Sequence, residues 1–316
     1  MRYLKLVRYK NLIIIALTML SMRYLVMRPM LVGLGMQLQM DGWLFALLVG
    51  ATVLIAAAGY AINDYFDVLP DALNRPDTQI VGRSVSKRTA IAIHSALNAL
   101  GVVMGAVVAF GVGRPMLALI FALTTGVLWF YSTTYKRQLL VGNLVVALLS
   151  ALVPLLPLIF EYPMFQVYWG SVVMYQIKLY PMVYWVSSYA AFAFLLTLAR
   201  EIIKDMEDFE GDSSFGRNTL PVYFDMRVAK AVVCAVLMLT NALLALAMAG
   251  YLRATQPLDV VTLVYGIVLV LMPIFALMVL LLMAREKRHY RTASTLCKLI
   301  MLLGIGYTLV FCYLVA

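Results

Sequence analysis

Apolar runs of about 20 residues recur from one end of the chain to the other, and no other feature restricts the possible folds so strongly. A helix needs about 20 mostly apolar residues to cross the hydrocarbon core of a bilayer. Of the 316 residues, 64% are hydrophobic and 13% are charged, whereas soluble globular chains carry roughly 25% charged residues. We therefore expect an integral membrane protein rather than a water-soluble one.

Reading each apolar run between its polar interruptions predicts nine transmembrane helices. The first run is the least regular, because Arg23 and Arg28 interrupt it. It is too long for the apolar part of a typical signal peptide, so we expect it to stay in place as the first helix. The predicted fold class is all-α, a polytopic membrane protein with a single domain over residues 1–316. The nine spans lie near 12–34, 43–62, 89–112, 115–134, 139–160, 182–203, 231–251, 259–283 and 299–316.

The basic residues gather in alternate loops. Twenty of the 25 Lys and Arg residues lie in or beside the N-terminal segment and the loops after the second, fourth, sixth and eighth runs. The opposite loops hold only Arg114, Lys178 and Arg253. Cytoplasmic loops of membrane proteins carry the excess of Lys and Arg. We therefore expect a protein of the cell membrane whose N-terminus and basic loops lie on the cytoplasmic side. The net charge of +10 then reflects the membrane topology and does not indicate binding to nucleic acid. No obligate protein partner is expected either.

Carboxylates are few, and ten of the 15 Asp and Glu residues lie in two short stretches, 63–77 and 201–212. Each stretch follows an apolar run at its expected cytoplasmic end. Both stretches contain the spacing D-x-x-D-x-x-x-D. The first aspartate motif consists of Asp64, Asp67 and Asp71, and the second aspartate motif of Asp205, Asp208 and Asp212.

This spacing predicts that the three carboxylates of a motif share one face of a helix end. At about 100° per residue, offsets of 0, 3 and 7 fall within roughly 60° of one another. Pro70 and Gly211 indicate that each helix is ending where its third aspartate stands. Carboxylates so close together repel one another unless cations neutralise them. Magnesium suits this role, because it is bound by one or two carboxylates together with substrate phosphates.

Basic residues close to both motifs extend this interpretation. Arg75, Arg83 and Lys87 follow the first motif, and Arg200 and Lys204 lie beside the second. Carboxylates, a metal ion and Arg or Lys side chains together form the arrangement expected around a diphosphate.

Other interpretations of the acidic stretches stay open. They could be solvated loop charges, although a repeated spacing at matching ends of two apolar runs argues against this. They could belong to a cation transporter, although the acids of transporters usually lie nearer the middle of the membrane. A CDP-alcohol phosphotransferase is also polytopic and rich in carboxylates, but its D-G-x-x-A-R signature is absent from the sequence.

At the two motifs the sequence resembles the UbiA superfamily of intramembrane prenyltransferases. The first signature of that family, N-D-x-x-D-x-x-x-D followed by N-R-P, corresponds to residues 63–71 and 74–76. The second signature, K-D-x-x-D-x-x-G-D, corresponds to residues 204–212. The resemblance covers nearly the whole chain.

Two further stretches bear on the resemblance. A segment typical of the family contains Tyr131-Ser132, Lys136 and Gly142-Asn143. Many members have a second basic residue and a proline after N-R-P, where this chain has Asp77-Thr78-Gln79. Diphosphate contacts from this loop are therefore expected from Arg83 and Lys87 instead.

The resemblance implies a nine-helix bundle with a cytoplasmic cap of helix ends and loops, and a cavity that opens sideways to the lipid and holds the prenyl tail. It also implies magnesium-assisted departure of a diphosphate, after which the allylic cation alkylates an acceptor while water is kept out. The implied catalytic and metal-binding residues are Asp64, Asp67, Asp71, Asp205, Asp208 and Asp212, and the implied diphosphate-binding residues are Asn63, Arg75, Arg83, Lys87, Lys136, Arg200 and Lys204.

The acceptor is the part that the sequence restricts least. Residues 200–212 look most like members that alkylate a glycerol-ether phosphate, the digeranylgeranylglyceryl phosphate synthase-like enzymes. In those members a hydroxyl group is the nucleophile, and the extra basic residues would hold the acceptor phosphate. The main alternative is an aromatic acceptor of quinone biosynthesis, of the hydroxybenzoate or dihydroxynaphthoate type, and haem, chlorophyll or other acceptors also stay open. The expected partners are thus a polyprenyl diphosphate, a lipid or aromatic acceptor, and membrane lipid.

Overall fold

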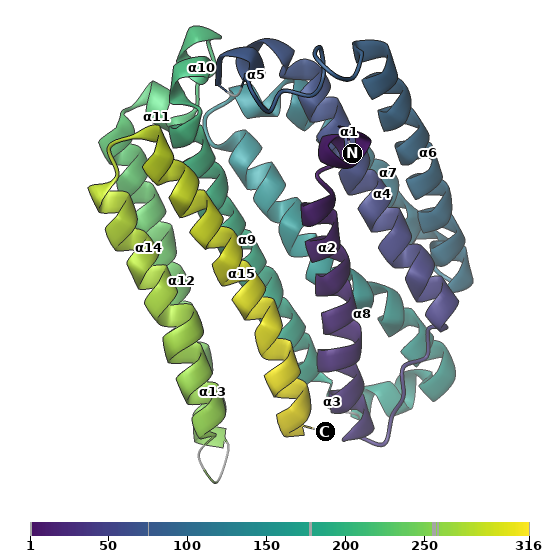
Figure 1. Ribbon diagram of the computed structural model, residues 1–316. Helices are drawn as coiled ribbons and strands as arrows, with labels where there is room; N and C mark the ends of the chain where they lie inside the picture. Colours follow the sequence, from purple (N-terminus) through teal and green to yellow (C-terminus); the bar gives the residue numbers. More distant parts are fainter. Residues whose placement is uncertain (1, 75, 177–178, 255–256, 258, 316) are drawn as a thin grey trace. The chain divides into compact units, whose positions relative to one another are not determined.

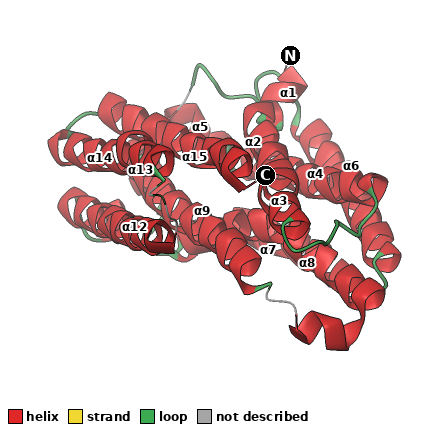
Figure 2. Cartoon of the chain, turned by 90° about the horizontal axis from the view of Figure 1, so that it is seen from below, coloured by secondary structure: helices red, strands yellow, loops and turns green. Residues whose placement is uncertain are grey.

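The structure is a computed structural model that describes residues 2–74, 76–176, 179–254, 257 and 259–315. Within these residues the regular elements are helices (Figures 1 and 2), and one isolated bridge joins Val81 and Val85. Up to residue 137 the elements are α1 (Arg2–Leu6), α2 (Tyr9–Ser21), η1 (Met22–Met27), α3 (Arg28–Val32), α4 (Gly42–Phe66), α5 (Val68–Asn74), α6 (Lys87–Gly111), η2 (Pro115–Leu117), α7 (Ala118–Thr133) and η3 (Tyr135–Arg137). The later elements are α8 (Val141–Gln176), α9 (Tyr180–Glu207), α10 (Phe209–Ser214), α11 (Leu220–Tyr223), α12 (Met226–Ala254), α13 (Val260–Tyr265), η4 (Gly266–Leu271), α14 (Met272–Met283) and α15 (Lys287–Val315).

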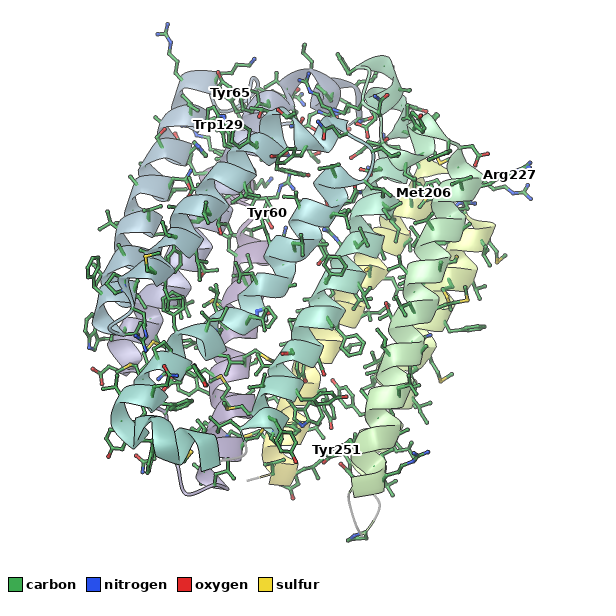
Figure 3. The ribbon with its side chains drawn as sticks, turned by 180° about the vertical axis from the view of Figure 1, so that it is seen from behind. Tyr60, Tyr65, Trp129, Met206, Arg227 and Tyr251 are labelled. Atoms are coloured by element: carbon green, nitrogen blue, oxygen red, sulfur yellow. The ribbon has the colours of Figure 1, made fainter. Side chains whose placement is uncertain are left out.

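Nine helical segments of the described chain are long and apolar enough to cross a membrane, and they match the nine predicted runs in order. A membrane-spanning helix satisfies its own backbone hydrogen bonds, which the lipid cannot do. The predicted all-α fold with nine spans is therefore confirmed, and the chain is a multi-pass membrane protein. Many large apolar side chains are exposed along these helices (Figure 3), as expected for surfaces that face lipid.

Two spans extend ten residues or more beyond a predicted end. The fifth was expected to end at residue 160, but α8 continues to Gly170 as a candidate span, because the side chain of Glu161 is buried and paired. The ninth was expected to begin at residue 299, but α15 already begins at Lys287. Its first three turns are amphipathic, and they bury Tyr290, Ala293 and Cys297 in the protein core.

The chain divides into two compact units, and the boundaries between them fall within η3, α8 and α9. Unit 1 comprises residues 1–135 and 152–188, and unit 2 comprises residues 136–151 and 189–316. The expectation of a single domain over the whole chain stays a prediction.

In unit 1, α4 packs against α6, α2 and α7. The approach of α6 is close because it carries glycines at its contacts. A Cβ atom on Gly101 would lie 2.7 Å from Cγ1 of Ile55, and one on Gly105 would lie 2.2 Å from the Phe121 ring. Small residues let helices in a membrane approach each other at backbone distance. This packing fixes α4, which carries the first aspartate motif at its C-terminal end.

In unit 2, a core of buried side chains from α9, α12, α14 and α15 surrounds residues such as Ile202, Val233, Ile274 and Cys297. Along this unit, Met206 and Arg227 lie towards one end and Tyr251 towards the other (Figure 3). The second aspartate motif, which includes residues on either side of Met206, is thus placed at the end of unit 2 where α12 begins.

Two of the spans contain a π-helical segment, and in both a proline follows two residues later. These segments are η1, followed by Pro29, and η4, followed by Pro273. A proline ring clashes with the carbonyl group four residues earlier in an α-helix. A π turn inserts one extra residue and moves that carbonyl group away. The prolines therefore explain why both helices widen at these positions.

A buried ion pair lies in unit 1, in the first span and α8. Nη2 of Arg23 is 3.4 Å from Oε2 of Glu161, and the exposed fractions of the two side chains are 3% and 0%. Oε1 of Glu161 accepts hydrogen bonds from the backbone N–H groups of Gln39 and Met40, and Arg23 donates to the carbonyl oxygen of Met40. The pair thus ties the loop before α4 to two helices, which explains how Arg23 is tolerated inside the first apolar run.

Candidate active site

The first aspartate motif lies where α4 ends and α5 begins. Asp64 is in the last turn of α4, and Asp67 follows the helix with φ −92° and ψ 10°. The N–H of Asp67 donates to the carbonyl of Asn63, and the N–H of Asp71 donates to the carbonyl of Asp67. Backbone hydrogen bonds therefore form the bend, and the third aspartate belongs to the short helix after it.

The second aspartate motif has the same local structure. Asp205 is in the last turn of α9, and Asp208 stands between α9 and α10 with φ −97° and ψ 12°. The N–H of Asp208 donates to the carbonyl of Lys204, and the N–H of Asp212 donates to the carbonyl of Asp208. The sequence predicted that each helix would end at the third aspartate. This prediction is wrong, because each helix already ends at the second aspartate of its motif.

The residues three positions after each bend explain part of this difference. Pro70 has no N–H to donate to the carbonyl of Phe66, so α4 cannot continue regularly past this point. Gly211 occupies the equivalent position after α9 and is a poor helix former. Both residues then fall within the next short helix, and Pro70 is tolerated there because it lies in the first turn.

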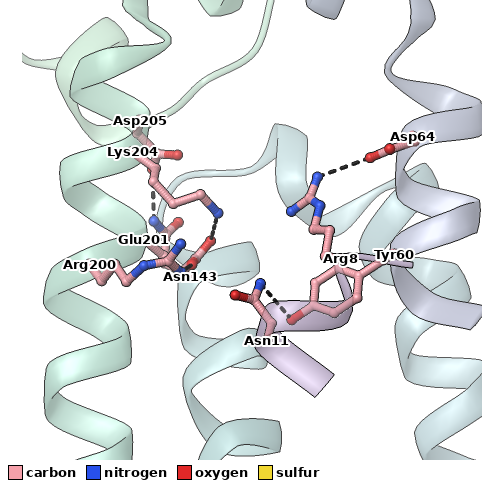
Figure 4. A network of polar contacts seen from close by, with 9 residues as sticks. All are labelled: Arg8, Asn11, Tyr60, Asp64, Asn143, Arg200, Glu201, Lys204 and Asp205. Atoms are coloured by element: carbon pink, nitrogen blue, oxygen red, sulfur yellow. Dashed lines mark hydrogen bonds and ion pairs between the residues drawn. The ribbon is translucent and has the colours of Figure 1, made fainter. Parts of the chain in front are cut away.

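In unit 1, Asp64 has a basic partner that the sequence did not assign to the site (Figure 4). Nη2 of Arg8 is 2.9 Å from Oδ1 of Asp64, and the guanidinium lies 5.0 Å from the centre of the Tyr60 ring. Burial alone would lower the pKa of Arg8, but the carboxylate of Asp64 beside it raises the pKa above its ordinary value. Asp64 and Asp67 are both buried, with exposed fractions of 8% and 7%.

In unit 2, a carboxylate outside the motif holds two of the predicted basic residues (Figure 4). Oε1 of Glu201 is 2.7 Å from Nη1 of Arg200, and Oε2 of Glu201 is 2.7 Å from Nζ of Lys204. Asn143 at the start of α8 donates a hydrogen bond of 2.7 Å from Nδ2 to Oδ2 of Asp205. Glu201 and Asn143 thus fix the positions of three residues that the sequence assigned to the site.

The third aspartate of the second motif also has a basic partner. Nη1 of Arg217 is 3.2 Å from Oδ1 of Asp212, whose side chain is almost completely buried. Next to the motif, Nε of Arg291 on α15 is 3.1 Å from Oε1 of Glu207. These pairs supply positive charge around carboxylates that would otherwise repel one another.

The other predicted residues are distributed over both units. In unit 1, Arg83 is exposed and donates a hydrogen bond of 2.7 Å to the carbonyl oxygen of Pro76. Lys87 begins α6, and its Nζ lies 5.7 Å from the centre of the Tyr65 ring. Tyr65 follows Asp64 directly in the chain. Lys136 is half-buried in η3 of unit 2. Arg75 lies outside the described residues.

Magnesium fits the donors present in each motif. Within the described residues, no three His, Cys, Asp or Glu side chains converge to hold a metal ion by themselves. Magnesium does not require this, because it keeps several water molecules and uses one or two carboxylates together with substrate phosphates. Buried aspartate oxygens beside Arg and Lys are hard donors of the kind that magnesium prefers. The donor set therefore suits magnesium bound together with a phosphorylated substrate.

Four residues that contact the motif aspartates or their basic neighbours were not predicted as site residues from the sequence. They are Arg8, Asn143, Glu201 and Arg217. The only signal for Arg8 was its contribution to the basic N-terminus, and its contact with Asp64 joins residues 56 positions apart. Glu201 could have been found, because offsets of three and four residues place it beside Lys204 and Asp205 on one helix face. Asn143 lay in the stretch typical of the resembled family but had no role assigned.

Comparisons with known proteins identify the family of this chain. The model of the UbiA prenyltransferase family matches residues 26–311. The chain belongs to the UbiA prenyltransferase family. Membership of this family confirms the resemblance stated from the two motifs and favours a prenyltransferase over a transporter.

Relatives in the UbiA family include several archaeal digeranylgeranylglyceryl phosphate synthases. The synthase of Ignicoccus hospitalis is 34% identical over 201 residues, which are 62% of this chain and 61% of that protein. The synthase of Hyperthermus butylicus is 33% identical over 240 residues, which are 74% of this chain and 71% of that protein. The chain thus spans about three fifths of the length of the first of these relatives.

Solved structures of UbiA proteins share the fold. A structure that describes digeranylgeranylglyceryl phosphate synthase has a TM-score of 0.64 at 21% identity, covering 98% of this chain and 97% of that one. A UbiA homologue of Archaeoglobus fulgidus bound to GPP and Mg²⁺ has a TM-score of 0.58 at 15% identity, covering 98% of this chain and 100% of that one. At these identities the likeness establishes the fold.

Proposed function

We propose that the protein transfers a prenyl group from a prenyl diphosphate to a lipid acceptor, with magnesium as cofactor and geranylgeranylglyceryl phosphate as the acceptor. The observation that carries the proposal is the repeated bend at the two aspartate motifs. Each motif places three carboxylates around the end of a transmembrane helix, next to Arg or Lys side chains. The UbiA homologue of Archaeoglobus fulgidus, which has the same fold, is bound to GPP and Mg²⁺.

The residues of the chain have separate roles in this proposal. The six aspartates of the two motifs hold magnesium, which supplies the positive charge that stabilises the departing diphosphate. Arg200, Lys204 and Lys136 hold diphosphate oxygens in unit 2, and Asn63, Arg75, Arg83 and Lys87 do so in unit 1. Glu201 keeps Arg200 and Lys204 in position, and Asn143 orients Asp205. The reaction requires that water be kept away from the allylic cation, because water would quench it.

The glycerol-ether acceptor is favoured by the relatives, several of which are digeranylgeranylglyceryl phosphate synthases of 30–34% identity. A phosphorylated acceptor also needs basic residues beyond those that hold the diphosphate. Arg217 and Arg291, which pair with Asp212 and Glu207, are candidates for this role in unit 2.

The test is diphosphate release by the purified protein in detergent with geranylgeranyl diphosphate and magnesium. Geranylgeranylglyceryl phosphate, hydroxybenzoate and dihydroxynaphthoate are offered separately. We expect release, together with a new ether product seen by mass spectrometry, with the glycerol phosphate alone, and loss of both when EDTA removes the metal.

The alternatives give different results in the same assay. Product with an aromatic acid alone would retain the prenyl transfer and overturn the choice of acceptor. Failure to bind the diphosphate in the presence of magnesium would overturn the proposed reaction.

We also propose that the N-terminus and both aspartate motifs lie in the cytoplasm and that the C-terminus lies outside. Alkaline phosphatase becomes active only outside the bacterial cytoplasm. We expect high activity when it is fused to the C-terminus, and low activity when it is fused after residue 138, in the basic loop before α8. The reverse pair of activities would contradict this orientation.

A further inference from the structure

Arg8 occupies a position that a counter-ion of the first aspartate motif would take. Its Nη2 is 2.9 Å from Oδ1 of Asp64, and its charge also interacts with the carboxylate of Asp71. The side chain of Arg8 has an exposed fraction of 32%, so a ligand can reach it. Nothing in the sequence separates Arg8 from the other basic residues of the N-terminal segment.

The backbone on both sides fixes Arg8 in this position. Arg8 has φ 51° and ψ 52°, a left-handed conformation, at the joint between α1 and α2. On one side, Leu6 is completely buried in a cluster with Ala61, Val81, Val85 and Ala90. On the other side, Nδ2 of Asn11 donates to the hydroxyl group of Tyr60, whose ring lies beneath the Arg8 guanidinium. The contact with Asp64 is therefore a built feature of unit 1.

A guanidinium and a magnesium ion compete for the same carboxylate. Nη2 of Arg8 takes one acceptor position of Oδ1, and a metal held by the other acceptor positions of the Asp64 carboxylate would repel the guanidinium. A diphosphate that arrives with magnesium offers the guanidinium a new anionic partner, and phosphate oxygens match the planar donors of arginine well. Arg8 can therefore exchange its charge-assisted hydrogen bond to Asp64 for one to a phosphate oxygen.

We propose that Arg8 is a diphosphate-binding residue that neutralises Asp64 while the site is empty and moves to a phosphate oxygen when magnesium and the diphosphate bind. This inference rests on the proposed function of the first aspartate motif. The proposed role predicts opposite effects on the affinity for the metal alone and on the affinity for the diphosphate. Removal of Arg8 strengthens the binding of the metal alone, because a competitor is lost, and weakens the binding of the diphosphate, because a partner is lost.

The experiment compares wild type with Arg8→Ala as full-length proteins in detergent. Mn²⁺, a paramagnetic substitute for Mg²⁺, is titrated alone and its free concentration is read by EPR. Geranylgeranyl diphosphate is then titrated calorimetrically at saturating Mg²⁺. For Arg8→Ala we expect about tenfold tighter Mn²⁺ binding and about tenfold weaker diphosphate binding, as for one hydrogen bond to a charged group.

Two further variants separate this role from a general effect of charge or folding. Lys10→Ala removes the same charge from an exposed position two residues along, and we expect both affinities to stay within about twofold of wild type. Arg8→Lys keeps the charge, so we expect metal binding near that of wild type and only partial recovery of diphosphate binding. If Arg8→Ala does not yield folded protein, Arg8→Gln is measured instead, with the same pair of shifts expected.

The outcomes distinguish the two proposals. If both affinities fall together in Arg8→Ala, or neither changes, the role of Arg8 is overturned while the proposed function stands. If the wild-type protein binds neither Mn²⁺ nor the diphosphate, the proposed function itself fails.

Discussion

Replacing Asp67 or Asp208 by asparagine is expected to lower the rate of prenyl transfer by about a thousandfold or more. Each substitution removes the negative charge that attracts the metal, and a metal ion contributes several kcal/mol to the stabilisation of a departing diphosphate. Asparagine has nearly the same shape as aspartate. The bends at both positions are made by backbone hydrogen bonds, so we expect the variants to fold.

Two isosteric substitutions at carboxylates other than the six motif aspartates are matched controls. Asp77→Asn lies near the first motif and Glu210→Gln near the second, and both side chains are exposed. We expect transfer within about twofold of wild type in these controls, since exposed charges are screened by salt. Turnover is followed by diphosphate release, and folding by size-exclusion chromatography in detergent. Near-normal turnover in Asp67→Asn or Asp208→Asn would exclude that residue from the metal site.

Replacing Arg23 by alanine is expected to destabilise the protein by about 3–5 kcal/mol, because Glu161 would keep a buried charge without its partner. Glu161 is completely buried. In the described residues its Oε2 atom has no hydrogen bond, nor do Nε and Nη1 of Arg23. The remaining atoms of the pair hold the backbone of Gln39 and Met40, so its loss would also release the loop that carries these two residues.

The midpoint of thermal unfolding in detergent measures this effect, and we expect it to fall by about 10 °C. Arg28→Ala removes the same type of residue from an exposed position in the same span and should change the midpoint by no more than about 2 °C. The double variant Arg23→Met with Glu161→Leu should recover most of the loss, because apolar residues of similar volume can replace a buried pair. Equal midpoints for Arg23→Ala and Arg28→Ala would show that the pair does not stabilise the fold.

The sequence predicted the fold well because a lipid environment demands long apolar runs, and such runs can be counted without knowledge of tertiary contacts. It failed where polar residues lie inside a helix. Glu161 suggested the end of a span, but Arg23 neutralises it, and this pairing joins residues from opposite halves of the chain. The basic start of α15 suggested a loop, whereas its buried side chains alternate with exposed ones in a helical pattern.

The candidate site was predicted only in part, because only some of its features are local in the sequence. The aspartate spacing is local, so both motifs could be found directly from the chain. The bend at the second aspartate was missed because the conformation of a residue such as Asp208 depends on the hydrogen bonds on both sides of it. The contacts of Arg8 with Asp64 and of Asn143 with Asp205 depend on tertiary structure, and no spacing rule connects them.

The π turns before Pro29 and Pro273 affect how this chain is aligned with its relatives. Each π turn inserts one residue into a helix whose two ends are otherwise held by packing. A relative without the proline has no need of the extra residue, so its helix should be one residue shorter at that point. An alignment without a gap there would shift one side of the helix by about 100°, and it would pair buried positions of one protein with lipid-facing positions of the other.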